Sequence, residues 1–102
     1  MLYDLHCRYD TRASFYGKAQ VKEEEHSGKH GKTRQLALYS YNTLVATITY
    51  FDIDGKKRTS YVCYGKYSCT TTRHQKEFFK QNGLSDKKIK ELFNKGTLEI
   101  EE

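Results

Sequence analysis

The sequence predicts an α+β fold, in which an antiparallel β-meander of about five strands carries two C-terminal helices packed on one face. Three observations lead to this class. Apolar and polar residues alternate over much of the first two thirds of the chain, an Asp-Gly pair at 54–55 marks a tight hairpin turn, and two helical patterns follow. Because 102 residues is a usual size for one domain, we expect residues 1–102 to form a single domain.

Two alternating stretches, residues 1–9 and 14–21, predict the first two strands. Gly17 inside the second stretch predicts a bulge or a close backbone approach. Residues 22–35 contain no apolar side chain, so they predict a long, solvated and mobile hairpin tip. The chain then returns as a strand over residues 36–41.

The most strand-like run is residues 43–53, and the Asp-Gly turn that follows sets its pairing with the next strand. A two-residue turn places Ala46 opposite Cys63 and Ile48 opposite Tyr61. The expected core face holds Leu44, Ala46, Ile48, Tyr50, Tyr61 and Cys63. The other face mixes polar residues with Val45, Phe51 and Val62, which predicts that part of it is covered.

The first helix is predicted from about residue 73 to residue 82. The T-x-x-Q spacing of residues 72–75 matches a capping box at its start. Gly83 suits the left-handed residue that ends a helix, with Leu84 closing back on Phe79.

The second helix is predicted over residues 86–94, with Ser85 as its N-cap and Gly96 as its end. Its apolar stripe consists of Ile89, Leu92 and Phe93. Residues 97–102 alternate Leu and Ile with acids, which is typical of an edge strand or a frayed tail.

Charge and cysteine content bound the function. The formal net charge is +5, which permits contact with nucleic acid without requiring it. Three cysteines, an odd number, without a signal peptide predict free thiols in a reducing cytoplasm. No apolar run approaches the length of a membrane span, so no membrane partner is expected.

Three blocks of sequence carry a resemblance: SFYGKA at 14–19, LYSYNTLVA at 38–46 and YS-x-TT-x-RH-x-x-EFF at 67–79. Together they resemble a small family of unknown function encoded by phages, prophages and mobile elements of Gram-positive bacteria. The resemblance implies a phage-related accessory protein in the cytoplasm of an infected host. By analogy with other small phage proteins, it suggests an inhibitor of host defence such as an anti-CRISPR protein.

A structural zinc site is one hypothesis for the cysteines. Cys63, Cys69 and His74 lie within a dozen residues, and Cys7 would supply a fourth ligand if its strand lies beside this hairpin. The spacing matches no standard zinc motif. The alternative is that the thiols are buried in the core, where free cysteine is common.

Catalysis is not expected. Cys69 and His74 would make a nucleophile and a base, but no orienting acid is identifiable. The carboxylates come as solvated runs, and no phosphate loop or dinucleotide motif is present. We therefore predict a non-enzymatic protein.

Two binding hypotheses remain. The leading one is a protein–protein contact with a host defence protein, for example a CRISPR effector nuclease. The alternative is a nucleic-acid-binding accessory or regulatory protein that uses the basic helices. The helix start near Arg73 would also suit an anion, although a plainly capped helix explains it equally. The predicted partner-binding residues are Arg73, Lys76, Lys80, Phe51, Tyr64 and Tyr67.

Overall fold

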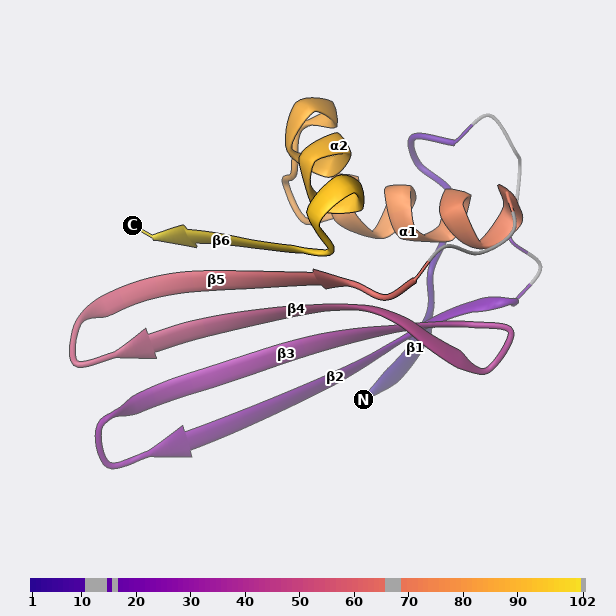
Figure 1. Ribbon diagram of the computed structural model, residues 1–102. Coiled ribbons are helices and arrows are strands. Elements are labelled where there is room, and N and C mark those ends of the chain that lie inside the picture. Colours follow the sequence, from indigo (N-terminus) through magenta and orange to yellow (C-terminus); the bar gives the residue numbers. More distant parts are fainter. Residues whose placement is uncertain (11–14, 16, 66–68, 102) are drawn as a thin grey trace.

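The computed structural model describes residues 1–10, 15, 17–65 and 69–101. Within them, six strands form one antiparallel sheet in the order β1-β2-β3-β4-β5-β6 (Figure 1). The strands are β1 (Leu2–Asp4), β2 (Ala19–Gly28), β3 (Gly31–Ser40), β4 (Thr43–Ile53), β5 (Lys56–Cys63) and β6 (Thr97–Glu101). The helices α1 (Cys69–Gln81) and α2 (Asp86–Lys95) follow β5 and pack on one face of the sheet. The predicted fold class is confirmed, with a sixth strand because residues 97–101 pair with β5.

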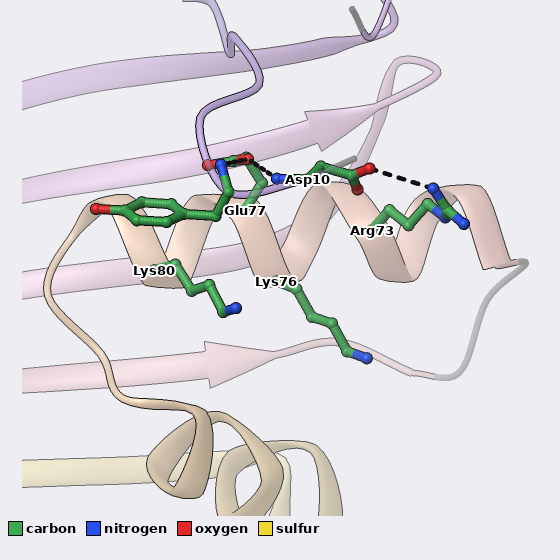
Figure 2. Close-up of a pocket in the computed structure, with 6 residues that line it drawn as sticks. Asp10, Arg73, Lys76, Glu77 and Lys80 are labelled. Atoms are coloured by element: carbon green, nitrogen blue, oxygen red, sulfur yellow. Dashed lines mark hydrogen bonds and ion pairs between the residues drawn. The ribbon is translucent and has the colours of Figure 1, made fainter. Parts of the chain in front are cut away.

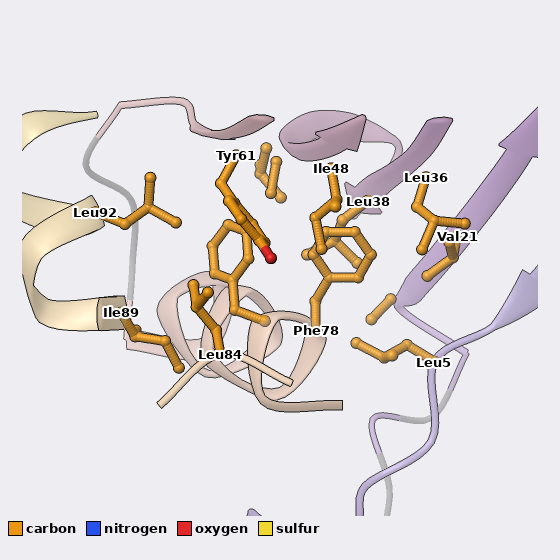
Figure 3. Packing of buried hydrophobic residues seen from close by; sticks show 14 of the residues in the cluster. Leu5, Val21, Leu36, Leu38, Ile48, Tyr61, Phe78, Leu84, Ile89 and Leu92 are labelled. Atoms are coloured by element: carbon orange, nitrogen blue, oxygen red, sulfur yellow. The ribbon is translucent and has the colours of Figure 1, made fainter. Parts of the chain in front are cut away.

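The core lies between the helices and the sheet (Figure 3). Phe78 points from α1 toward Leu38 and Ile48, and all three side chains are fully buried. Leu92 of α2 lies toward the same end of the core as Tyr61 (Figure 3). Burial of each such side chain contributes about 1.5–3 kcal/mol, so this layer supplies most of the stability of the fold.

The Asp54-Gly55 turn sets the register as predicted. Both residues have positive φ, 53° and 78°, which is the geometry of the primed hairpin turn. Ala46 pairs with Cys63 and Ile48 pairs with Tyr61. The predicted bounds of β4 match those observed, because its alternation and its turn both specify the same strand.

A β-bulge changes the predicted core face at the start of β4. Leu38 pairs with Ala46 while Tyr39 pairs with Leu44, so Val45 is an extra residue in this strand. The prediction that Leu44 faces the core is therefore wrong: Leu44 is 36% exposed, whereas Val45 is only 1% exposed. The second face is partly covered, as expected, and Thr47 is also buried there.

Residues 22–35 form a solvated hairpin, as predicted, but regular strands extend through it where a long irregular tip was expected. β2 and β3 pair from Ala19 with Ser40 to Gly28 with Gly31, leaving a two-residue turn. The apolar pattern gave no sign of these strands because polar groups stabilise them. Arg34 of β3 pairs with Glu23 of β2 across the strands, and Lys22 pairs with Glu24 at 3.1 Å within β2.

The first strand is shorter than predicted, and the second begins later than predicted and continues further along the chain. β1 ends at Asp4, and the chain leaves the sheet after Leu5, whose amide still donates to the carbonyl of Ala19 at 2.9 Å. β2 begins only at Ala19, because the amide of Lys18 donates to the carbonyl of Phe15 in a tight turn. Gly17 has φ 73° at this turn rather than in a bulge.

The start of α1 differs from the prediction, while its end agrees with it. The helix begins at Cys69, so the capping box predicted over residues 72–75 does not exist. At the other end Gly83 has φ 90°, and the amide of Leu84 donates to the carbonyl of Phe79 at 3.0 Å. This is the Schellman geometry that the sequence indicated.

The predicted boundaries of α2 agree with the structure to within one residue. The hydroxyl of Ser85 accepts from the amide of Lys88 at 3.3 Å, and Gly96 ends the helix with φ 82°. The apolar stripe of α2 faces the core, where Leu92 is fully buried. No helix in the described part of the chain is long and apolar enough to cross a membrane.

Replacement of Gly31 by Ala tests the register at the hairpin end. A Cβ at Gly31 would collide with the backbone of Asp52 and Ile53 in the neighbouring strand. We expect G31A to lower the free energy of unfolding by about 1–3 kcal/mol, because the strands must move apart to accept the methyl group. Chemical denaturation measures the loss.

Gly28→Ala is the matched control, because a Cβ there would meet its nearest atom at an ordinary 3.9 Å. G28A should leave stability almost unchanged. Equal stability of G31A and the parent chain would contradict the β3–β4 register at this end.

Candidate functional site on the cationic face of α1

Three of the predicted binding residues lie together on α1. Arg73, Lys76 and Lys80 are spaced three and four residues apart, so they follow one side of the helix (Figure 2). Lys76 is exposed, while the side chains of Arg73 and Lys80 keep 41% and 32% of their surface accessible. We call these three residues the α1 cationic stripe.

Beside the stripe, the carboxylate of Glu77 holds the N-terminal segment. Its Oε1 accepts the backbone amides of Arg8, Tyr9 and Asp10 at 2.9, 2.7 and 2.9 Å. Gln81 donates to its Oε2 at 2.8 Å. The side chain is only 1% exposed, and both of its carboxylate oxygens accept hydrogen bonds, as a buried charge requires.

These hydrogen bonds set the charge state of Glu77. Burial alone acts to raise the pKa of Glu77, but the hydrogen bonds from Gln81 and from the three backbone amides outweigh it, so the pKa is lowered from its ordinary value of 4.5. The group is therefore an anion at neutral pH. Its hydrogen bonds come from Gln81 and the backbone, and it forms no ion pair with the described cations of the stripe.

Two of the three cations have a carboxylate partner. Arg73 pairs with Asp10 at 3.2 Å, and Lys80 pairs with Asp86 at 3.0 Å. Lys80 also lies 6.0 Å from the ring centroid of Tyr9. Among the described residues, none forms an ion pair with Lys76.

The stripe borders two hollows. One, of about 100 Å³, lies between α1 and residues 9–10. The other, of about 500 Å³, lies between α1 and α2, and we call it the interhelical groove. The groove is lined by Lys76, Lys80, Asp86, Ile89, Lys90, Phe93 and Asn94. Its apolar part comes from α2, and lysines from both helices border it.

A buried polar cluster fixes α1 to the sheet on its other side. The hydroxyl of Ser40 is hydrogen-bonded to Nδ1 of His74 at 2.8 Å and to the hydroxyl of Thr71 at 3.1 Å. His74 is 1% exposed, with the ring of Phe15 edge-on at 4.5 Å. A Ser–His pair can serve nucleophilic catalysis, but this one is enclosed by protein. Its position suits it to hold α1 against β3.

The bulge in β4 provides another link to α1. Gln75 donates to the carbonyl of Val45 at 2.9 Å, and the amide of Tyr64 donates to the same oxygen at 3.0 Å. The extra residue of the bulge thus turns its carbonyl toward the helix.

The predicted metal ligands are placed as follows. Cys7 and Cys63 are half-buried against the core, His74 lies in the polar cluster, and Cys69 is the first residue of α1. Burial raises the pKa of the Cys63 thiol to about 11, which keeps it protonated. Within residues 1–10, 15, 17–65 and 69–101, no three His, Cys, Asp or Glu side chains gather in a way that could hold a metal ion. The zinc hypothesis stays a prediction.

Of the remaining predicted binding residues, Phe51 and Tyr64 do not lie on α1. Phe51 is on the sheet face opposite the helices, since its neighbour Tyr50 packs against the core. Tyr64 follows β5 and is 40% exposed. Tyr67 lies outside the described residues.

Sequence reasoning missed Glu77, Gln75 and Ser40. Glu77 binds backbone amides, which leave no signature in residue type, and Gln75 binds a carbonyl exposed by a bulge that no pattern indicated. One signal was present. Glu77 directly precedes Phe78 and Phe79, which places it at the border of the helix face that buries both rings.

The chain belongs to a family of unknown function. Residues 3–95 match the model of that family, described as Family of unknown function (DUF8033). No curated protein and no solved structure matches the chain.

Glu77→Gln tests the hydrogen-bonded anchor of the N-terminal segment. The amide cannot offer a charged acceptor to three backbone N–H groups, so we expect E77Q to lower the free energy of unfolding by about 2–4 kcal/mol. The control is Glu91→Gln, which removes an exposed pair with Lys95 and should cost about 0.5 kcal/mol or less. Denaturant titration at pH 7 measures both. Equal losses would contradict the special role of Glu77.

The charge of Glu77 also predicts that the stability lost in E77Q depends on pH. The folded-state pKa of Glu77 lies below its unfolded value, so the charged carboxylate stabilises the fold fully above about pH 4.5. This stability is lost as the pH falls from there through the folded-state pKa. The stability difference between parent and E77Q should therefore narrow in acid. A difference that is constant from pH 7 to pH 3 would show that Glu77 acts without its charge.

Proposed function

We propose that the protein is a non-enzymatic binding protein that grips an acidic surface of another protein with the interhelical groove. The proposal rests on one observation: lysines without an ion-pair partner among the described residues border a groove that is lined by apolar side chains. Lys76 and Lys90 are exposed, and neither forms an ion pair with any described residue. Between the helices, Ile89 and Phe93 line the same groove.

This chemistry favours a protein partner over a phosphate backbone. A nucleic-acid phosphate backbone would bind the lysines of the groove but would gain little affinity from its apolar lining. A protein segment that carries one apolar side chain between carboxylates would satisfy both parts of the groove. The alternative, a nucleic-acid-binding accessory protein, would use only the lysines of this surface.

The resemblance to phage-encoded proteins gives the proposal its concrete form. In that form the partner is a host defence protein, such as a CRISPR effector nuclease, and the chain acts in the cytoplasm of an infected bacterium. Binding alone would inhibit the partner, with no catalysed reaction. The α1 cationic stripe and Lys90 would make the contact, and the anchor at Glu77 would keep α1 in place.

A plaque assay tests the inhibitory role. In a CRISPR-immune strain, expression of the chain should raise the plating efficiency of the targeted phage at least about tenfold. The variant Lys76→Glu with Lys90→Glu should lose this effect, since buried or half-buried charge pairs at interfaces contribute strongly to affinity. No rise with the parent chain, against a panel of effector types, would overturn the anti-CRISPR form of the proposal.

The matched control is Lys87→Glu with Lys88→Glu. Both double variants lower the net charge from +5 by four, to +1, and both lie in the same helical layer. Lys87 and Lys88 are exposed but do not line the groove. Pull-downs from nuclease-treated lysate should retain the same partner for the parent and the control and lose it for the groove variant. Loss of the partner on nuclease treatment alone would favour the nucleic-acid alternative.

A further inference from the structure

The hairpin ends of the sheet form a second basic region, away from the helices. In Figure 1 the β2–β3 and β4–β5 hairpins extend beyond the helical layer. Residues 26–33 and 51–58 contain five Lys or Arg and two Asp, a net +3 of the chain's +5. Because the helices do not cover this part, both faces of the sheet are accessible in the described structure.

An arginine rests on an aromatic ring at this end. The guanidinium carbon of Arg58 lies 4.6 Å from the ring centroid of Phe51, its direct partner across β4 and β5. Phe51 is half-buried and Arg58 is exposed, so the guanidinium packs on the ring in a cation–π contact and its outer face stays open to solvent. The pair lies on the open face of the sheet, in a row with His26 and Thr33.

A hollow of about 600 Å³ adjoins this pair. It is lined by Phe51, Ile53, Asp54, Lys56, Lys57, Arg58 and Glu101. Ile53 is 43% exposed and adds an apolar wall. Of the two acids, Asp54 faces His30 at 3.8 Å, and Glu101 pairs with Arg58 in the register of β5 and β6. Lys56 and Lys57 form no ion pair with a described residue.

We propose that this surface binds single-stranded nucleic acid. An unpaired base stacks on the Arg58–Phe51 pair, since arginine planes and aromatic rings are the usual platforms for unstacked bases. The ammonium groups of Lys56 and Lys57 contact the flanking phosphates. A duplex hides its base faces, so it can use the lysines but not the platform. This surface is separate from the interhelical groove and does not depend on its role.

The direct test is fluorescence anisotropy with a fluorescein-labelled dT12 strand, and with rU12 to compare DNA and RNA. The parent chain should bind dT12 at 50 mM salt and bind a 12-base-pair duplex more weakly. Lys56→Glu with Lys57→Glu should weaken binding at least about tenfold and reduce the slope of log Kd against log salt by about 1.4, about 0.7 for each lost phosphate contact. Phe51→Ala should weaken binding about tenfold.

Two further measurements make the test decisive. Lys87→Glu with Lys88→Glu makes the same change of charge on α2 and should leave dT12 binding within about twofold of the parent. Thermal melting checks that each variant is folded, and Arg58→Gln, at an exposed residue, replaces Phe51→Ala if that variant does not fold. A twelve-residue poly-glutamate peptide should compete poorly, because it has no bases.

Three results would overturn the proposal. The first is no binding of dT12 by the parent chain at 50 mM salt. The second is equal loss for the hairpin and α2 double variants, which would mean non-specific attraction. The third is competition by poly-glutamate as strong as that by unlabelled dT12, which would assign the surface to acidic proteins.

Discussion

The carboxylate of Glu77 lies where α1 meets the segment that leaves the sheet after β1, and it accepts the amides of residues 8–10. Those amides belong to irregular backbone that no strand or helix satisfies, so without the carboxylate they would need water inside a partly buried contact. The same residue precedes Phe78 and Phe79 in α1. One side of the helix therefore anchors the N-terminal segment while the adjacent side fills the core.

Polar contacts also determine how α1 sits on the sheet. His74 meets Ser40 of β3, and Gln75 meets the carbonyl that the bulge at Val45 exposes. Each contact is directional, whereas the apolar core alone would tolerate sliding of the helix. Because the α1 cationic stripe lies on this helix, the same contacts determine its position. Its orientation toward solvent and toward α2 is thus a property of the whole helical layer.

The sequence was sufficient wherever a local signal and the hydrophobic pattern agreed. The Asp54-Gly55 turn, the end of α1 at Gly83 and the limits of α2 were predicted on that basis. Residues 22–35 were predicted as a hairpin tip, but their regular strands were missed because ion pairs and backbone pairing, not burial, stabilise them. At the site, the stripe was predicted from helical spacing. Its supporting contacts were not, because their partners are backbone groups brought together only by the fold.

The order of the sheet bears on how the chain folds. From β3 to β5 each strand pairs with the strand just before it across a two-residue connection, so these pairings form at low entropic cost. The chain contains no proline, so no X-Pro isomerisation delays any step. The pairing of β6 with β5 forms later, because the two helices separate these strands in the sequence. During synthesis the sheet can therefore grow one hairpin at a time, with its apolar face uncovered until the helices emerge and close it.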